Sequence, residues 1–280
     1  MKITFNLNTK IIILLKYLSL CTLFLSSACT NKIEHKPTFL RTNPPEISGD
    51  LLNGRIDIQY INAESRNYGQ LKTDLLSEFD HDSGEPTVEG DQAVYFRGNV
   101  GLTQFMDAYA RSSWNAPTIY GVKMQIFGKP KRPGWRSSLS AEYGKFHSES
   151  NLEEYLEYSH DLYDVSLGIG YRENSTLLLY MNVFYSEHKI NGKLRRDNDL
   201  KYSVNGKSKG VGGLVGLEYS VLNHDRFFGG KISSHFNLEA GISNLNWLTT
   251  IDHEKNDDST HQSPANDMNG ILLSTSLSWH

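Results

Sequence analysis

Beyond residue 91 the chain alternates bulky apolar residues with small or polar ones at every second position. Val165, Leu167 and Ile169, for example, are separated by serine or glycine. Such a period of two predicts β-strands with one apolar and one polar face. The pattern recurs in eight stretches: 94–102, 120–126, 135–144, 163–171, 177–186, 211–221, 228–242 and 271–279. Tilted strands of about ten residues are long enough to cross a bilayer.

The segments between these stretches are alternately short and long. Short turns are predicted at 128–134, 172–175 and 223–226, and long polar loops at 103–117, 146–160, 188–207 and 244–267. Outer-membrane barrels have short periplasmic turns and longer extracellular loops. The alternation therefore predicts an all-β fold, an antiparallel up-and-down β-barrel of eight strands, over residues 92–280.

Residues 54–91 leave the number of strands open. Ile56, Ile58 and Tyr60 alternate with polar residues, and Leu71 to Leu75 carry a weaker alternation. This segment could form an extra hairpin, which would give ten strands, or a plug or a periplasmic strand; eight strands are favoured for the barrel and the role of this segment stays open. The acidic stretch 78–91 is predicted as a loop because it contains glycine and proline.

The apolar face of the predicted strands is expected to point toward lipid. An eight-stranded barrel is just wide enough inside to be filled by side chains, which suits the small and polar face. Aromatic residues near the strand ends are typical of an interfacial girdle. The residues concerned are Tyr120, Trp135, Tyr143, Tyr163, Tyr171, Tyr219 and Trp279.

The polar face carries charges of both signs, which a narrow lumen would force to pair. An ion-pair network inside the barrel is therefore predicted. Its members are Arg97, Lys123, Glu142, Asp164, Glu218, Lys231 and Glu239. The alternative use of these residues is a polar binding or catalytic cleft.

Residues 1–28 are predicted to be a signal peptide. Lys2, Lys10 and Lys16 form a positive region, and an apolar stretch follows over 17–25. Cys21 would be lost with the leader, so no intramolecular disulfide is expected in the exported chain. Residues 29–53 are polar, contain several prolines and show no periodicity, and a flexible tether is predicted there.

The end of the leader, Leu25-Ser26-Ser27-Ala28-Cys29, resembles the lipobox of bacterial lipoproteins. The resemblance implies that Cys29 becomes the first residue of the exported chain and carries acyl chains. Ser26 departs from the apolar residue usual in that family. Ser26 and Ala28 also fit ordinary signal-peptidase cleavage, so both kinds of processing stay open. The two residues after Cys29 lack the aspartate that retains lipoproteins at the inner membrane, which implies outer-membrane sorting.

Composition narrows the class of protein. The 280 residues have a formal net charge of −4, which gives no reason to expect a nucleic-acid partner. Mean hydropathy is −0.46 and no long apolar run follows residue 28, which excludes a helical membrane protein. A barrel remains compatible, because its alternating strands average to a moderate hydropathy.

The search for chemistry finds no catalytic or metal-binding constellation, so no enzyme activity, cofactor or metal is predicted. His235 and Glu239 share a strand face, but a serine two residues after the histidine, as in the lipid A deacylase family, is missing. His235 is interpreted as a lumen histidine. His253 and His261, and likewise the Asp80–Asp82 stretch, are interpreted as solvated loop residues because their spacing matches no known site.

In pattern, residues 92–280 resemble the small outer-membrane barrels of the OmpA-domain and OmpX type. The C-terminal Ser276-Leu277-Ser278-Trp279-His280 is similar to the signal read by the barrel-assembly machinery, although His280 follows the usual terminal aromatic residue. The resemblance implies a non-enzymatic protein in contact with outer-membrane lipids that displays long loops in a structural, adhesive or surface-interaction role. Two alternatives stay open: a lipid-anchored soluble β-barrel that binds a host ligand, and a lipid-modifying outer-membrane enzyme.

Overall fold

The computed structural model describes the backbone of residues 32–35, 38–49, 51–71, 79–80, 87–113, 116–151, 154–196, 199–227, 230–253 and 256–279. Side chains are described for residues 38–49, 51–65, 88–113, 116–147, 157–193, 203–221, 232–248, 250 and 268–279. Within the described part of the chain, no helix has the length and apolar character that a membrane span needs. The predicted signal peptide and Cys29 lie outside the described residues.

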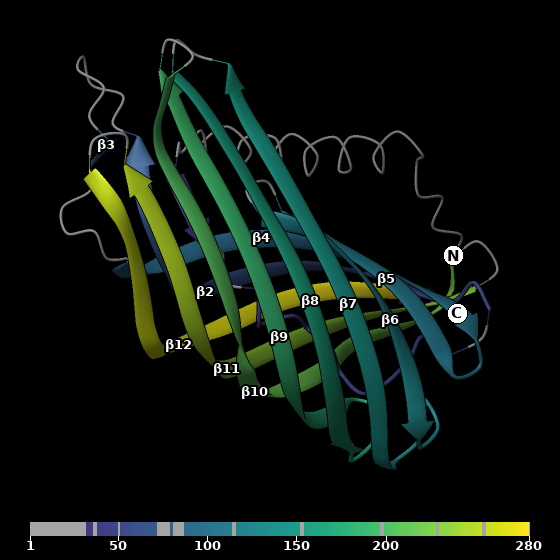
Figure 1. The fold of residues 1–280 in the computed structure, drawn as a ribbon. Helices are drawn as coiled ribbons and strands as arrows, with labels where there is room; N and C mark the ends of the chain where they lie inside the picture. Colours follow the sequence, from purple (N-terminus) through teal and green to yellow (C-terminus); the bar gives the residue numbers. More distant parts are fainter. Residues whose placement is uncertain are drawn as a thin grey trace. The chain divides into compact units, whose positions relative to one another are not determined.

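Twelve strands make up the described fold, and each pairs antiparallel with its neighbours (Figure 1). Their bounds are β1 Lys32–His35, β2 Gly54–Leu71, β3 Phe79–Asp80, β4 Thr87–Thr103, β5 Met106–Ser113, β6 Ala116–Phe127, β7 Gly134–Asn151, β8 Glu154–Arg172, β9 Leu177–Arg196, β10 Asp199–Phe227, β11 Gly230–His253 and β12 Asn256–Trp279. Because β2 pairs with both β4 and β12, the ten strands β2 and β4–β12 close into an up-and-down barrel.

The barrel therefore has ten strands, and the prediction of eight is wrong, whereas the alternative of ten is right. One additional strand, β2, contains the alternation of Ile56, Ile58 and Tyr60. The other, β5, lies inside the predicted loop 103–117. Its outward positions are taken by small residues such as Ala108 and Ala110, so bulky apolar residues do not mark it in the sequence. Most of the predicted second strand of the hairpin, residues 71–75, lies outside the described residues.

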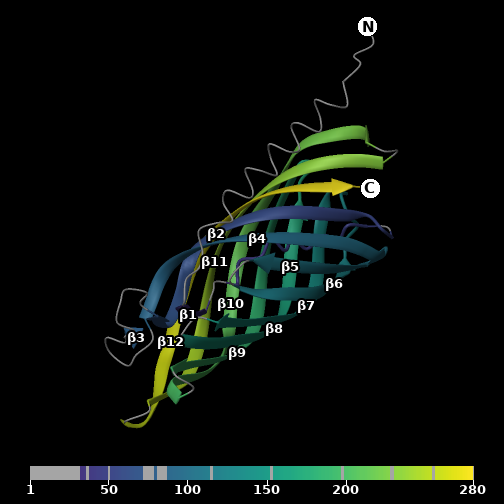
Figure 2. The same ribbon diagram turned by 90° about the horizontal axis from the view of Figure 1, so that it is seen from above.

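The long polar segments are also different from the prediction. The segments 146–160, 188–207 and 244–267 were predicted as loops, but most of their residues continue the β-ladders as long hairpins. The strand β10 alone runs for 29 residues. At the opposite rim the turn predicted at 223–226 is displaced, because β10 and β11 stay paired as far as Phe227 and Gly230. Figure 2 shows the C-terminus at this short-turn rim, away from β1 and β3.

A belt of bulky apolar side chains covers the outside of the barrel, as expected. Val165, Met181 and Val183 are about half exposed, whereas their strand neighbours Ser166 and Asn182 are buried inside. Exposed aromatic residues mark both edges of this belt. Tyr60, Tyr120, Tyr143, Tyr163 and Tyr185 lie at the edge toward the hairpins, and Phe105, Phe127, Trp135, Tyr171, Tyr219 and Trp279 lie toward the short turns.

The predicted tether is the largest difference between sequence and structure. Within 29–53, the residues Thr38–Ile47 are buried inside the barrel, with Glu46 partly so. We call residues 38–48 the plug segment. A polar chain without periodicity resembles a tether in sequence. Here, however, side chains of the barrel wall form hydrogen bonds with its backbone N–H and C=O groups.

Candidate functional site

The polar lumen and the plug segment form one network, which is the candidate functional site. The plug segment belongs to no strand, so its backbone N–H and C=O groups need other partners once they are buried. Inward side chains of six barrel strands, β2, β4, β5, β6, β9 and β11, supply them. The network has three layers, which follow one another from the hairpin side to the short-turn rim.

In the upper layer, two arginines of the wall hold the plug segment by its carbonyl oxygens. Arg111 of β5 donates to the carbonyls of Thr38 and Leu40, at 2.8 and 2.6 Å. Arg97 of β4 donates to the carbonyls of Arg41 and Thr42. Each guanidinium also lies over an aromatic ring, Arg97 over Tyr109 and Arg111 over Tyr95, at 4.1 and 5.0 Å from the ring centroids.

In the middle layer, Glu239 of β11 accepts hydrogen bonds from three consecutive backbone N–H groups of the plug segment. The donors are the amides of Arg41, Thr42 and Asn43, at 3.1, 2.9 and 3.2 Å. The hydroxyl of Tyr180 donates to the same carboxylate at 2.7 Å. The Tyr180 ring lies over Gly216 of β10, where an added Cβ would come within 2.3 Å of the ring, so this position requires glycine.

The side chain of Arg41 forms the central ion pair of the middle layer. Its guanidinium makes a two-pronged contact with Asp164 of β8, with Nη2 to Oδ2 at 3.1 Å, and lies 3.5 Å from Glu142 of β7. Arg41 and Asp164 are both buried, so each charge depends on the other for compensation. Ser186 also donates to Asp164, and the Arg41 guanidinium lies 4.5 Å from the Phe184 ring centroid.

In the lower layer, the plug segment is held by charges of both signs. Glu46 binds Arg172 of β8, with Nε to Oε1 at 2.7 Å, and Arg136 of β7. Lys123 of β6 donates to the carbonyl of Pro44 at 3.1 Å. The amide and hydroxyl of Ser48 both donate to Asp107 of β5, at 2.7 and 3.0 Å.

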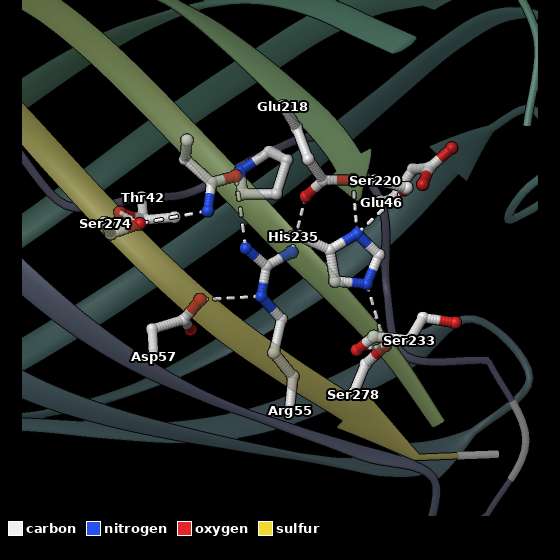
Figure 3. Close-up of polar contacts among 12 residues, drawn as sticks. Thr42, Glu46, Arg55, Asp57, Glu218, Ser220, Ser233, His235, Ser274 and Ser278 are labelled. Carbon is white, nitrogen blue, oxygen red and sulfur yellow. Dashed lines mark hydrogen bonds and ion pairs between the residues drawn. The ribbon is translucent and has the colours of Figure 1, made fainter. Parts of the chain in front are cut away.

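Below these contacts a cavity of about 310 Å³ opens near the short-turn rim. Figure 3 shows the polar contacts around Arg55 and His235, which both line this cavity. Arg55 of β2 bridges Asp57 and Glu218, at 2.7 and 2.5 Å, and Arg172 also donates to Glu218, at 2.9 Å. These contacts neutralise the Glu218 carboxylate.

His235 lies between two serine hydroxyls in this cavity. Its Nδ1 is 2.9 Å from Ser220 Oγ, and its Nε2 is 2.9 Å from Ser278 Oγ. A serine–histidine pair is the beginning of a nucleophilic site, and such a site needs a carboxylate that orients the histidine. Glu218 is 3.8 Å from Nδ1, but it is already bound by two arginines, and Ser220 takes the Nδ1 position. Both ring nitrogens of His235 therefore have a serine hydroxyl as hydrogen-bond partner, which fits the interpretation of His235 as a lumen histidine.

The structure brings together most of the residues predicted for the lumen network. Six of them are buried in the lumen, and the side chain of Lys231 lies outside the described residues. Their partners differ from the prediction. Arg97, Lys123 and Glu239 bind backbone groups of the plug segment, and Asp164 binds Arg41, instead of pairing among themselves.

Several network residues were not predicted. On the strands they are Arg55, Asp57, Asp107, Arg111, Arg136 and Arg172, and in the plug segment they are Arg41 and Glu46. Arg55, Asp57, Arg136 and Arg172 could have been found, because they share the inward parity of the alternating residues beside them. Asp107 and Arg111 lie on β5, which no alternation of bulky apolar residues marks. Arg41 and Glu46 lie in a stretch without periodicity and carried no such signal. The side chains of His253, His261 and 80–82 lie outside the described residues. Among the residues described, no group of three or more histidine, cysteine or acidic side chains is placed to hold a metal ion.

Comparisons with known proteins give likeness of overall fold only. No protein-family model and no curated protein matches the chain. Among solved structures, the outer membrane protease OmpT of Escherichia coli is similar at a TM-score of 0.41 and 12% identity, over 87% of this chain and 99% of that one. The outer membrane protein OprG of Pseudomonas aeruginosa follows at 0.33 and 11%, over 84% and 97%. The attachment invasion locus protein Ail of Yersinia pestis is similar at 0.31 and 10%, over 82% and 98%. At these values no activity of those proteins carries over to this chain.

Proposed function

We propose that this chain is an integral outer-membrane barrel, closed by its plug segment, that presents long hairpins at the cell surface in a structural or surface-interaction role. The observation that carries the proposal is the reversal of polarity along single strands. On β9, Met181, Val183 and Tyr185 face outward, and beyond them the outward residues become Glu187 and Lys189.

The inward side changes in the opposite direction at the same height. Within the belt, the inward residues of β9 and β11 include Asn182, Asn237 and Glu239, whereas beyond it they include Ile190 and Trp247. An apolar exterior with a polar interior suits lipid, and the reverse suits water. The reversal therefore supports a membrane boundary at this height.

The dimensions of the belt support the same proposal. Trp135 and Tyr143 on β7, like Tyr171 and Tyr163 on β8, are eight residues apart. Eight residues of a strand extend for about 27 Å, and a tilt of about 40° reduces this to about 20 Å. The apolar band of outer-membrane barrels is about 25 Å tall, with aromatic girdles at both edges.

The outward belt also bears on the two alternatives. A soluble lipid-anchored barrel would turn its apolar face inward, but the described residues of this face point outward. A lipid-modifying enzyme would require the Ser278–His235 pair to reach an acyl substrate, whereas both residues lie inside the lumen, with Ser278 buried.

The test is extraction of outer-membrane fractions with carbonate or urea, combined with gel migration before and after boiling. An integral barrel resists extraction and migrates differently when boiled. Ready extraction of the chain without a shift on boiling would refute the proposal. The variant Cys29→Ser separates the two anchors, because an integral barrel resists extraction without acyl chains and a lipid-tethered one does not.

A further inference from the structure

The direction of the plug segment through the barrel has a consequence for membrane topology. Strand β1, at the N-terminal side, pairs with Arg66–Gln70 of β2, beyond Ala63, where the pairing of β2 with β12 ends. This is the hairpin side of the barrel, and Figure 2 shows β1 and β3 on this side, away from the C-terminus. The segment therefore begins among the hairpins.

From that side the chain descends through the lumen in sequence order. Thr38 and Leu40 contact Arg111, two residues from the hairpin-side end of β5, and Glu46 contacts Arg172, the last residue of β8 at the short-turn rim. At that rim the chain leaves the lumen and enters β2 at Gly54, which pairs with Trp279. The plug segment thus spans the lumen between the two rims.

We propose that the chain N-terminal to the plug segment is displayed on the outer surface of the membrane, because it passes through the lumen of its own barrel. This inference rests on the proposed function, since it requires the hairpins to face outward. The contacts of the three layers hold the plug segment along this path through the lumen. Withdrawal of the segment would remove the cation that compensates the buried Asp164, and the backbone hydrogen-bond partners of the buried Glu239, Arg97 and Arg111.

The length of chain before β1 fixes the position of Cys29. Two residues, Thr30 and Asn31, separate Cys29 from Lys32, so the chain extends over three residue steps for at most about 11 Å. This is less than half of an apolar band about 25 Å tall, so Cys29 cannot return to the short-turn side. The acyl chains predicted on Cys29 would enter the outer leaflet, and the protein would combine a barrel with a surface lipid anchor.

The experiment uses one epitope tag at three places in the full-length chain. The tag is inserted between Thr30 and Asn31, between residues 197 and 198, which connect β9 to β10, or between Lys129 and Pro130 at the short-turn rim. Antibody binding is measured on intact and on permeabilised cells. We expect the first two tags to bind antibody equally on intact and permeabilised cells, and the third to bind only after permeabilisation.

The outcomes separate this inference from the proposed function. A hairpin tag exposed on intact cells, with the Thr30 tag exposed only after permeabilisation, would overturn the inference and leave the barrel topology standing. A hairpin tag hidden on intact cells would overturn both.

A crosslink tests whether the molecules that expose the Thr30 tag also have the plug segment inside the lumen. Asn43 Nδ2 lies 3.0 Å from Ser140 Oγ, so cysteines introduced at both positions (Asn43→Cys and Ser140→Cys) can be joined by a short thiol-specific crosslinker between the plug segment and β7. We expect crosslinked molecules, selected by their gel migration, to carry a surface-exposed Thr30 tag. Crosslinked molecules whose tag is hidden on intact cells would contradict the inference even if the tag disturbed part of the population.

Discussion

The apolar belt and the hairpins beyond it are built by the same strands, yet they distribute polarity in opposite ways. In the belt, Val183 and Tyr185 face outward, while Asn182 and Ser186 are buried. A few residues further along β9, Lys189 and Lys193 face outward, while Ile190 is buried. The geometry of the strand does not change between the two regions. What changes is the surroundings to which the outward face is suited, which are lipid for the belt and water for the hairpins.

This comparison shows where each region gets its stability. The hairpin region has an ordinary hydrophobic interior, in which Tyr158, Ile190, Val204, Leu245 and Trp247 are buried. The interior of the belt is filled mainly by polar side chains and the plug segment, so its stability depends on complete pairing of buried polar groups. Buried networks of this kind are costly when a single member is removed.

The largest expected effect comes from removing one charge of the central ion pair. Arg41→Ala leaves Asp164 buried without its cation, and breaking a buried pair in this way costs about 3–5 kcal/mol. We expect a corresponding loss of stability in urea unfolding of the barrel in detergent, followed by gel migration. The double variant Arg41→Ala with Asp164→Asn should recover part of the loss, because it leaves no orphaned carboxylate at position 164. Equal stabilities of the single and double variants would contradict the role of Asp164 as the partner of Arg41.

The second-largest expected effect tests whether the apolar belt contacts lipid. Val183 is 53% exposed on the belt, and Val183→Arg places a charge on the lipid side near the middle of the proposed span. Arginine at the bilayer midplane destabilises a barrel by about 2–4 kcal/mol, and the penalty falls toward the interface. We expect poor folding into lipid vesicles, measured by the fraction that shifts on boiling.

Asn191→Arg is the matched control for this variant. Asn191 is an exposed, outward residue of the same strand, but it lies in the hairpin region. It should fold into vesicles as the unmodified chain does. If the two arginine variants fold equally well, the belt does not contact lipid, and the proposed boundary along β9 is wrong.

The same two regions explain how much could be predicted from the sequence. Strands such as β8 and β9 were found because Val165, Leu167 and Ile169, or Met181 and Val183, must be bulky and apolar toward lipid. The strand β5 was missed because its outward residues after Met106 are small: Ala108, Ala110 and Ser112. The hairpin extensions were taken for loops because their polarity pattern reverses, and a polar outward face with few bulky residues resembles a loop.

The plug segment could not be predicted from its own sequence. Its partners are up to 232 residues away, as with Thr42 and Ser274, and the contacts are made largely by its backbone. Backbone hydrogen bonds to distant side chains leave no periodic pattern in the segment. Charged residues at inward positions of the strands were the only available signal, and they predicted a network without revealing that a chain passes through it.

The smallest expected effect is a sensitivity of the hairpin region to acid. His160 of β8 is buried there, with Nε2 3.1 Å from Nδ1 of His188 on β9. Burial lowers the pKa of His160 to about 3, whereas an unfolded histidine has a pKa of about 6.5. Between these values the unfolded state binds a proton that the folded state excludes. The hairpin region should therefore lose stability as the pH falls below 6.5, by about 1.4 kcal/mol per pH unit for this residue.

Hydrogen exchange at pH 7 and pH 5, corrected for intrinsic rates, measures this loss by region. Exchange over residues 187–193 should accelerate at pH 5, while residues 177–185 in the belt should be little affected because they form part of a separately stabilised interior. His160→Leu should remove most of the acceleration, since no proton is gained at this position on opening. His147→Leu is the control, because His147 is exposed on β7, and its replacement should leave the acid response intact. An acid response that persists in His160→Leu and disappears in His147→Leu would mean that the exposed histidine, rather than the buried one, couples the hairpins to pH.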